Sequence, residues 1–393
     1  MEKIDKRDNH RVSIVRCKSY EPELVKERLA AVIDLLEVPP EPLFKDKKVL
    51  IKPNMLAARP PEEAVTTHPE VIRALIQLAR KMGGEPCLGD SPALGDFKRV
   101  ARISGLETVA RKEKASLVEF DHPVKLPVPK SYTFKGLQVA APVLEAGITI
   151  LNAPKLKTHQ MMVMTAAVKN MFGAVCGLEK GGLHLHAGRD HRWFARMLVE
   201  ITEVLAPKLT VMDAVEAMEG EGPAAGKKKK IGLLLASTSA TALDTVCAGI
   251  MRLSPGDVPT LAMAAELGIP GSSIDQVDIV GERLCDVVPE EYEMPGSALS
   301  VGFSLPGIIR SSLLKLTMPR SVPVFINKCT RCQACSQVCP AKAVSVDESG
   351  PKITTKLCIG CFCCSEVCPE KVFISKGGKI GRLLTRLTRA LLR

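Results

Sequence analysis

The sequence predicts an α/β protein, with a mostly parallel sheet covered by helices, followed by a small α+β domain rich in cysteine. Short apolar runs alternate with helical patterns over residues 1–295, which is typical of parallel strands joined by helices. Nine of the 14 cysteines fall between Cys329 and Cys368. With 46% hydrophobic and 25% charged residues, a chain of 393 residues is long enough for two or three folded domains.

Six segments of the first part are predicted strands, and most of them end in a polar residue. They are "KKVLIKPN" (47–54), "EPCLGDS" (85–91), "GITILN" (147–152), "KLTVMD" (208–213), "IGLLLAST" (231–238) and "VDIVGE" (277–282). Ligands bind outside the carboxyl ends of the strands in such sheets. Asn54, Asp90, Asn152 and Asp213 are therefore predicted to lie on one rim and to bind substrate.

A helix is expected in "TTHPEVIRALIQLARKMGG", which begins at Thr66. Thr67 and Glu70 have the spacing of a capping box, apolar residues recur at helical spacing, and Gly83 ends the pattern.

The stretch "LNAPKLKTH" (151–159) follows a predicted strand. In an extended chain, side chains two residues apart share a face, so Lys155, Lys157 and His159 would point the same way. The ordinary alternative is a solvated basic loop.

The segment after this stretch, "MMVMTAAVKNMFG" (161–173), is apolar nearly all round and suits a buried helix. Lys169 and Asn170 are its odd members, because a buried charge needs a partner or a task, and Lys169 is predicted to bind substrate. The alternative is that Lys169 extends to the surface from the end of the helix.

Two glycine-rich segments are expected to be loops. In "GLEKGGLHLHAGRDH" (177–191), metal binding by His184, His186, Asp190 and His191 is one interpretation, and proton donors or surface residues are the other. In "EGEGPAAGKKKK" (219–230) neither a phosphate-binding P-loop nor a dinucleotide fingerprint is present. Either Glu219 or Glu221 supplies a carboxylate to the rim, or the segment is a solvated turn.

The cysteines form two copies of one pattern, "CTRCQACSQVCP" and "CIGCFCCSEVCP", each reading C-x2-C-x2-C-x3-C-P. In this spacing three thiolates hold one iron-sulfur cubane and the fourth reaches the other. The expected ligands of one cluster are Cys329, Cys332, Cys335 and Cys368, and those of the other are Cys339, Cys358, Cys361 and Cys364. Zinc is the alternative, but zinc sites use paired spacing and four ligands.

The second copy has one additional cysteine, Cys363, where the first has Ala334. A small buried side chain is the expected role, with an alternate ligand as the other interpretation. The segments "AKAVSV" and "EKVFIS" are expected to pair as short strands. This part of the chain resembles the bacterial two-[4Fe-4S] ferredoxins, which implies one-electron transfer at low potential through two neighbouring clusters.

The net charge of +11 is concentrated near the C-terminus, since residues 321–393 carry +8. On a helical wheel the last residues form a basic amphipathic helix, which predicts contact with an anionic membrane surface, an acidic groove of a partner, or packing on its own domain. With one Trp and three Tyr the chain lacks the stacking aromatics of a general nucleic-acid binder. No apolar run approaches the roughly 18 residues of a spanning helix, and the N-terminal residues include no signal-like apolar segment. A cytoplasmic protein is therefore expected.

The motifs "IKPN", "TTHPE", "GDSP", "NAPKLKTH" with "AAVKNMFG", and "DAVEAMEGEGPAAG" occur in this order. Together they resemble the family known as domain of unknown function 362, over about residues 12 to 290. The resemblance implies a fold and, with the cysteine segment, an iron-sulfur role, but no established substrate. The expected organisation is an α/β domain (1–295), a linker (296–325), a two-[4Fe-4S] ferredoxin-like domain (326–375) and a tail helix (376–393).

These observations favour an oxidoreductase in which the two clusters pass electrons to an anionic or carbonyl-bearing organic substrate at the sheet edge. Lys155 and Lys157 would bind the negative group and His159 would deliver a proton, since the usual pKa of histidine lies close to neutral pH. A flavin would also pair single electrons, but no flavin motif is present. The alternatives are an electron-transfer or assembly subunit that docks a donor or acceptor protein, and an iron-sulfur redox sensor.

Overall fold

The computed structural model describes residues 10–39, 41–92, 95–297 and 320–376. Within them the largest sheet has ten strands, and eight follow the order β12-β1-β11-β10-β7-β2-β3-β4, with β8 paired to β10 and β9 paired to β8. The strands are β1 (Arg11–Arg16), β2 (Lys48–Pro53), β3 (Glu85–Asp90), β4 (Ser116–Glu119), β7 (Thr149–Ala153), β8 (Lys155–His159), β9 (Val163–Thr165), β10 (Leu209–Glu219), β11 (Lys227–Ser237) and β12 (Asp278–Gly281). The six predicted strands are all present.

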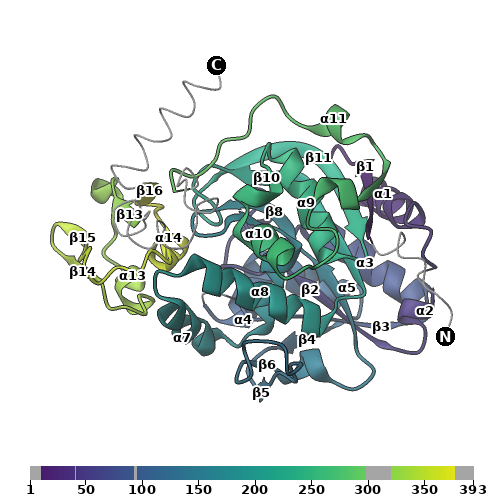
Figure 1. Cartoon of the computed structure of the whole chain (residues 1–393), viewed down its shortest axis with the longest axis horizontal. Helices are drawn as coiled ribbons and strands as arrows, with labels where there is room; N and C mark the ends of the chain where they lie inside the picture. Colours follow the sequence, from purple (N-terminus) through teal and green to yellow (C-terminus); the bar gives the residue numbers. More distant parts are fainter. Residues whose placement is uncertain (1–9, 40, 93–94, 298–319, 377–393) are drawn as a thin grey trace.

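Most neighbouring strands of the sheet run parallel, and the antiparallel pairs all involve β11 or the hairpin of β8 and β9. Helices cover both faces (Figure 1). They are α1 (Pro22–Asp34), α2 (Glu41–Phe44), α3 (Pro69–Lys81), α4 (Phe97–Ile103), α5 (Leu106–Lys112), α6 (Ala167–Asn170), α7 (Gly177–Ala187), α8 (His191–Leu205), α9 (Ala240–Ile250), α10 (Pro259–Glu266) and α11 (Leu284–Val287). A separate hairpin joins β5 (Pro123–Lys125) and β6 (Gln138–Ala140). The predicted α/β class is confirmed.

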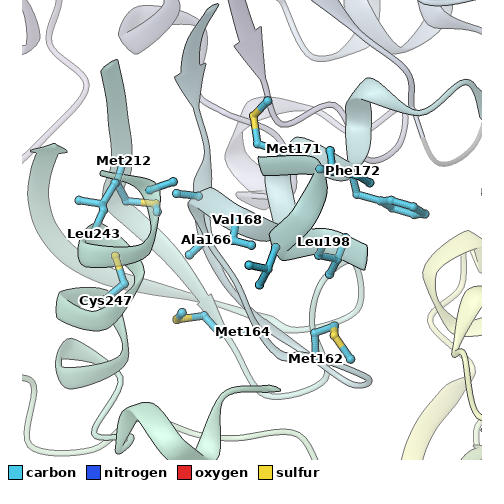
Figure 2. Close-up of a cluster of buried hydrophobic side chains, with 14 of the residues drawn as sticks. Met162, Met164, Ala166, Val168, Met171, Phe172, Leu198, Met212, Leu243 and Cys247 are labelled. Carbon is cyan, nitrogen blue, oxygen red and sulfur yellow. The ribbon is translucent and has the colours of Figure 1, made fainter. Parts of the chain in front are cut away.

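The core lies in two layers, one on each face of the sheet. Along β2, Val49 and Ile51 pack with residues of α1, α3 and α5 on one face, whereas Leu50 joins the core formed with α8, α9 and α10 on the other. A strand covered on both faces needs a continuous apolar run, which "VLI" supplies. Figure 2 shows part of the second layer, where Met162, Met164, Ala166, Val168, Met171 and Phe172 gather with Leu198, Met212, Leu243 and Cys247.

Two helix predictions need correction. The side chain of His68, not of Thr67, caps α3, with its Nδ1 accepting a hydrogen bond from the Glu70 amide. Thr67 is used elsewhere, since its hydroxyl donates to Ala153 O at 2.6 Å and accepts from the Asn54 amide. Residues 161–173 are not one buried helix. Val163 begins β9, which pairs with β8, and only the short α6 and a 3-10 turn (Met171–Ala174) follow.

Both segments predicted as glycine-rich loops contain regular structure. Residues 177–187 form helix α7, because the segment lies against the α/β core, and this packing outweighs the low helix propensity of glycine. The "GEGPAAG" turn joins β10 to β11, and both strands are longer than predicted. Asp213 is therefore inside β10 and not at its end. The lysines of β11 pair across the hairpin, as in Lys228–Glu216 at 3.1 Å and Lys229–Glu219 at 3.2 Å.

The cysteine-rich part contains β13 (Arg320–Pro323), α13 (Ala334–Gln337), β14 (Val344–Asp347), β15 (Gly350–Ile353), α14 (Cys363–Val367) and β16 (Phe373–Lys376). Strand β13 pairs with β16, and β14 with β15, so the two segments expected to pair with each other each have another partner. This part lies at one end of the molecule, shown in yellow in Figure 1, with α14 on the side of the α/β domain. The predicted tail helix lies outside the described residues, except for Lys376.

Candidate functional site

A cavity of about 460 Å³ lies between the α/β domain and helix α14 of the cysteine-rich part. Its volume is in the range of small-molecule sites, roughly 300 to 1,000 Å³. Charged and polar side chains converge on it from both parts, and apolar side chains form the remaining wall. The polar members are Asn54, Lys157, His159, Thr165, Lys169, Lys180, His184, Gln337, Cys363 and Glu366, and the apolar ones include Leu56, Phe172, Pro223 and Val338.

Lys157 enters the cavity from strand β8 and is fully buried. Its ammonium donates to Asn54 Oδ1 at 2.8 Å and to Val65 O at 2.7 Å. Burial lowers the pKa of Lys157 to about 7, against the opposing effect of the Glu366 carboxylate. The ammonium has three N–H donors, so one donor is left for a ligand.

A chain of amide hydrogen bonds holds Asn54 in place. Asn54 Nδ2 donates to Asn170 Oδ1 at 2.9 Å, and Asn170 Nδ2 donates to Asn152 Oδ1 at 2.8 Å. Asn152 Nδ2 in turn donates to Ala167 O at 3.1 Å. The carbonyl of Asn54 is thereby directed at Lys157. Asn152 therefore acts on the cavity through two other amides and does not line it.

Lys169 and Lys180 supply two further ammonium groups. Lys180 is buried and donates to Ser91 O and, at 3.4 Å, to Pro92 O, and burial lowers its pKa to about 7. Lys169 has no hydrogen-bond acceptor among the described residues; its Nζ lies 4.9 Å from the centroid of the Phe172 ring. Burial lowers the pKa of Lys169 as well, while Glu366 opposes the shift. Lys169 therefore lines the cavity and is available to a ligand.

His159 is held as a neutral imidazole with a defined tautomer. Its Nδ1 accepts hydrogen bonds from the amides of Met161 and Met162 at 3.0 and 3.2 Å. The proton is therefore on Nε2, which lies 3.4 Å from Glu366 Oε1. Burial, followed by the nearby lysines, lowers the pKa of His159 well below its usual value. The geometry suits His159 as a hydrogen-bond donor to a ligand, and the lysines with a pKa of about 7 are better placed to supply a proton.

Two polar atoms at the cavity wall have no hydrogen-bond partner in the described part of the chain: His184 Nδ1 and Thr165 Oγ1. His184 is 9% exposed and its ring stacks on Phe194 at 4.5 Å between centroids. Burial lowers its pKa to about 3, so the ring is neutral near pH 7. Buried polar groups are normally paired, and both atoms are therefore suited to contact a bound molecule.

A recess of about 50 Å³ adjoins the cavity and shares Asn54, Lys169 and Lys180 with it. Asp90 lines this recess and forms a buried ion pair with Lys52 at 2.7 Å. Gly173 is required here, since a Cβ at this position would lie 2.0 Å from Asp90 Oδ1 and 2.4 Å from Lys52 Nζ. The predicted residues Asn54, Asp90, Lys157, His159 and Lys169 thus meet at the cavity or its recess.

Lys155 and Asp213 do not line the cavity. They form a buried ion pair at 2.9 Å, and Tyr20 lies between them, with its hydroxyl donating to Asp213 Oδ1 and accepting from Lys155. The His68 ring stacks on Tyr20 at 3.5 Å. Both residues are buried within this network and away from the cavity, so the structure does not bring them together with the other predicted substrate contacts.

The cysteines predicted to hold the first cluster, Cys329, Cys332, Cys335 and Cys368, surround one small cavity of about 20 Å³. In the second set, burial raises the pKa of the Cys358 thiol, and the nearby Cys361 and Cys339 thiols raise it further. A cubane binds each thiolate through a different iron, so its four sulfurs surround a volume. The donor set fits two such clusters.

The four side chains considered above as ligands of one metal do not converge on a common point. The interpretation of His184, His186, Asp190 and His191 as ligands of one metal is not supported by their placement. Only His184 lines the cavity. His186 lies against the Trp193 ring, and Asp190 caps helix α8.

Several contacts join the cysteine-rich part to the α/β domain. Glu221 in the β10–β11 turn accepts hydrogen bonds from the Ser375 amide at 2.6 Å, the Ser375 hydroxyl at 2.9 Å and the Gly296 amide at 3.0 Å. Arg59 donates to Cys368 O, and Arg189 donates to Cys358 O. Glu221 therefore has a docking role, which differs from both a rim carboxylate and a solvated turn.

The sequence reasoning missed Lys180 and Glu366, and it gave Glu221 a different role. For Lys180 a signal exists, since Gly177, Lys180, Gly181 and His184 have the spacing of one helix face and all line the cavity. Assigning residues 177–187 as a loop concealed this pattern. Glu366 and Glu221 make contacts across the junction of the two parts, and no local spacing predicts such contacts.

Comparisons with known proteins agree with this architecture. The family model described as a domain of unknown function (DUF362) matches residues 49–249, and that of a 4Fe-4S dicluster domain matches residues 324–369. A thylakoid-associated protein of Synechocystis sp. is 33% identical over 301 residues, which is 77% of this chain and 92% of the relative. A crystal structure of a Thermotoga maritima protein is 13% identical over 61% of each chain, with a TM-score of 0.37, too low to support an argument.

Proposed function

This chain belongs to the DUF362 family and carries a 4Fe-4S dicluster domain, and from this premise we propose that it is an iron-sulfur oxidoreductase acting on an anionic or carbonyl-bearing organic substrate in the cavity. The dicluster domain makes the chain an iron-sulfur electron-transfer protein. One observation supports the proposal most: three lysines of the α/β domain meet Glu366 and Cys363 of the second cysteine motif around one cavity. A docking subunit would have no need for such a cavity.

The chain's own residues supply binding and proton transfer. Lys157, Lys169 and Lys180 attract the negative group of the substrate, and the Nε2–H of His159 donates to a carbonyl oxygen. When loaded, the cysteines would hold clusters that supply electrons one at a time. A carbonyl that gains two electrons also takes up two protons. Lys157 and Lys180, with pKa values of about 7, can each hold and release a proton at Nζ near neutral pH.

The test is a reoxidation assay on the cluster-loaded protein, reduced under anaerobic conditions. A panel of 2-oxo acids is added, and cluster absorbance is followed. At least one acid should restore the oxidised spectrum faster than buffer does, and Lys157→Met should slow this step, whereas the surface control Lys18→Met should not. If every acid behaves as buffer does and none stabilises the protein thermally, the electron-transfer or docking subunit is the better explanation.

We further propose peripheral membrane contact through the basic C-terminal tail, in addition to a protein electron donor or acceptor. The relative from Synechocystis sp. is described as thylakoid-associated, and the last 18 residues of this chain carry six lysines and arginines. The helices of the described residues include none with the length and apolar character of a membrane span. Contact with a membrane would thus be at its surface and would depend on anionic lipid.

A further inference from the structure

The charges around the cavity do not balance. Lys157, Lys169 and Lys180 line it, and Glu366 is the carboxylate among its lining residues. Two other buried lysines nearby form closed ion pairs, Lys52 with Asp90 and Lys155 with Asp213. The buried Asp244 carboxylate accepts from the Ala167 and Val168 amides and does not line the cavity. With all three lysines protonated, the side chains that line the cavity therefore carry a net charge of +2.

The three ammonium groups around one cavity repel one another, and part of the cavity wall is apolar. The Phe172 and Val338 side chains, with Leu56 and Pro223, form an apolar wall that offers the ammonium groups no hydrogen-bond acceptor. Lys169 has no acceptor within the described residues, and the unpartnered His184 Nδ1 and Thr165 Oγ1 are at the same wall. A ligand with two negative charges would neutralise the site and supply acceptors to these groups.

We infer that the substrate of this site is a small organic dianion, either a dicarboxylate or a phosphorylated acid. The three lysines attract its negative charges, and the Glu366 carboxylate offsets one of the lysines. The inference rests on the proposed function and specifies its substrate class. The apolar wall accommodates a short carbon skeleton between the charged groups. Glu366 brings a carboxylate of α14 to the cavity wall, where its Oε1 lies 3.4 Å from His159 Nε2.

Glu366 has a defined part in this selection. Its carboxylate comes from the cysteine-rich part and offsets one of the three lysines contributed by the α/β domain. Without it the site would carry an additional positive charge, and a dianion would gain more from this change than a monoanion because Coulomb attraction scales with ligand charge. Glu366 is thus a specificity-determining residue, and changing it should alter the ratio of the two affinities.

The test compares succinate with succinamate, which have nearly the same shape and differ by one charge. Anaerobic calorimetry on the full, cluster-loaded chain should show succinate binding at least about tenfold tighter. Lys169→Met should reduce this ratio and Glu366→Gln should increase it. The control Glu348→Gln removes an exposed carboxylate of the same cysteine-rich part and should leave the ratio unchanged. Inorganic phosphate is the second probe, and tighter binding of phosphate than of succinate assigns the phosphorylated class.

Three results would overturn the inference. If succinate and succinamate bind equally and binding still depends on Lys157, the preference for a dianion is rejected but the proposed anion site stands. Absence of Lys157-dependent binding for succinate, succinamate and phosphate removes both the inference and the proposed function. A ratio that neither Lys169→Met nor Glu366→Gln changes shows that the discrimination arises outside this cavity.

Discussion

Replacing Lys157 with Met separates a binding role from a structural one. The substitution removes a fully buried ammonium, together with its hydrogen bonds to Asn54 Oδ1 at 2.8 Å and Val65 O at 2.7 Å. Methionine fills a similar volume without charge. The change therefore acts on electrostatics and hydrogen bonding while the packing of strand β8 is largely kept.

Two opposing terms determine the effect on stability. Each lost hydrogen bond from a charged donor costs roughly 1.5 to 3 kcal/mol. Against this, the pKa of Lys157 falls from 10.5 to about 7 on burial, and at about 1.4 kcal/mol per pKa unit the buried charge costs roughly 5 kcal/mol. The terms nearly cancel, so we expect the free energy of unfolding to change by less than about 2 kcal/mol. Anion affinity, by contrast, should fall by about tenfold or more.

The matched control is Lys52→Met, the same substitution at another fully buried lysine. Lys52 pairs with Asp90 at 2.7 Å, and its loss leaves a buried carboxylate without its partner, which typically costs roughly 3 to 5 kcal/mol. Anaerobic urea denaturation measures the stability of both variants, and calorimetry with succinate measures affinity for Lys157→Met. If Lys157→Met destabilises as much as Lys52→Met, or leaves affinity unchanged, the assignment of Lys157 to the anion site is wrong.

Further predictions concern the pH dependence of the cavity lysines, the docking contact of Glu221 and the basic tail. Burial lowers the pKa of Lys157 and Lys180 to about 7, so raising the pH from 7 to 9 should weaken anion binding, by up to about tenfold per pH unit for each lysine. An affinity that stays constant from pH 7 to 9 would contradict the assignment of these lysines to the anion site. The same two lysines should make the unliganded protein more stable as pH rises from about 7 toward 10.5, since the unfolded chain then binds more protons than the folded one. Glu221→Gln should speed hydrogen exchange at the Ser375 amide by about tenfold or more without loss of iron, because one of two acceptor oxygens is lost; unchanged exchange would exclude Glu221 from docking. Deleting residues 379–393, which contain four arginines and one lysine, should release the protein from anionic vesicles with cluster content preserved, and equal vesicle binding by both forms would reject membrane contact.

The sheet and the cluster-binding role of the cysteines were predictable, because each depends on a local sequence pattern. Apolar runs that end in Asn54, Asp90 and Asn152 identify buried parallel strands and the edge where ligands bind. Asp213 has the same local pattern, but its strand continues to Glu219 because β11 pairs with it along its full length. That pairing partner begins 14 residues later, and its four lysines do not suggest a strand.

The site was only partly predictable, because half of its charges come from elements whose local sequence is ambiguous. Because of Gly181 and Gly182, residues 177–187 were predicted as a loop, and Lys180 was therefore missed. In the structure they form helix α7, which packs against the α/β core. Glu366 falls between two predicted cluster ligands, so its neighbours suggested only a cluster role. Its contact with His159 joins residues 207 positions apart in the chain, a separation that sequence periodicity does not encode.

The central claim is that an anion bound by the three lysines lies next to the cluster held by Cys339, Cys358, Cys361 and Cys364. Electron paramagnetic resonance of the anaerobically reduced, cluster-loaded protein tests it most directly, with and without saturating succinate. We predict that succinate changes the signal of one cluster in the wild type and leaves the spectrum of Lys157→Met unchanged at the same concentration. Superimposable wild-type spectra at a succinate concentration that calorimetry shows to be saturating would contradict the claim.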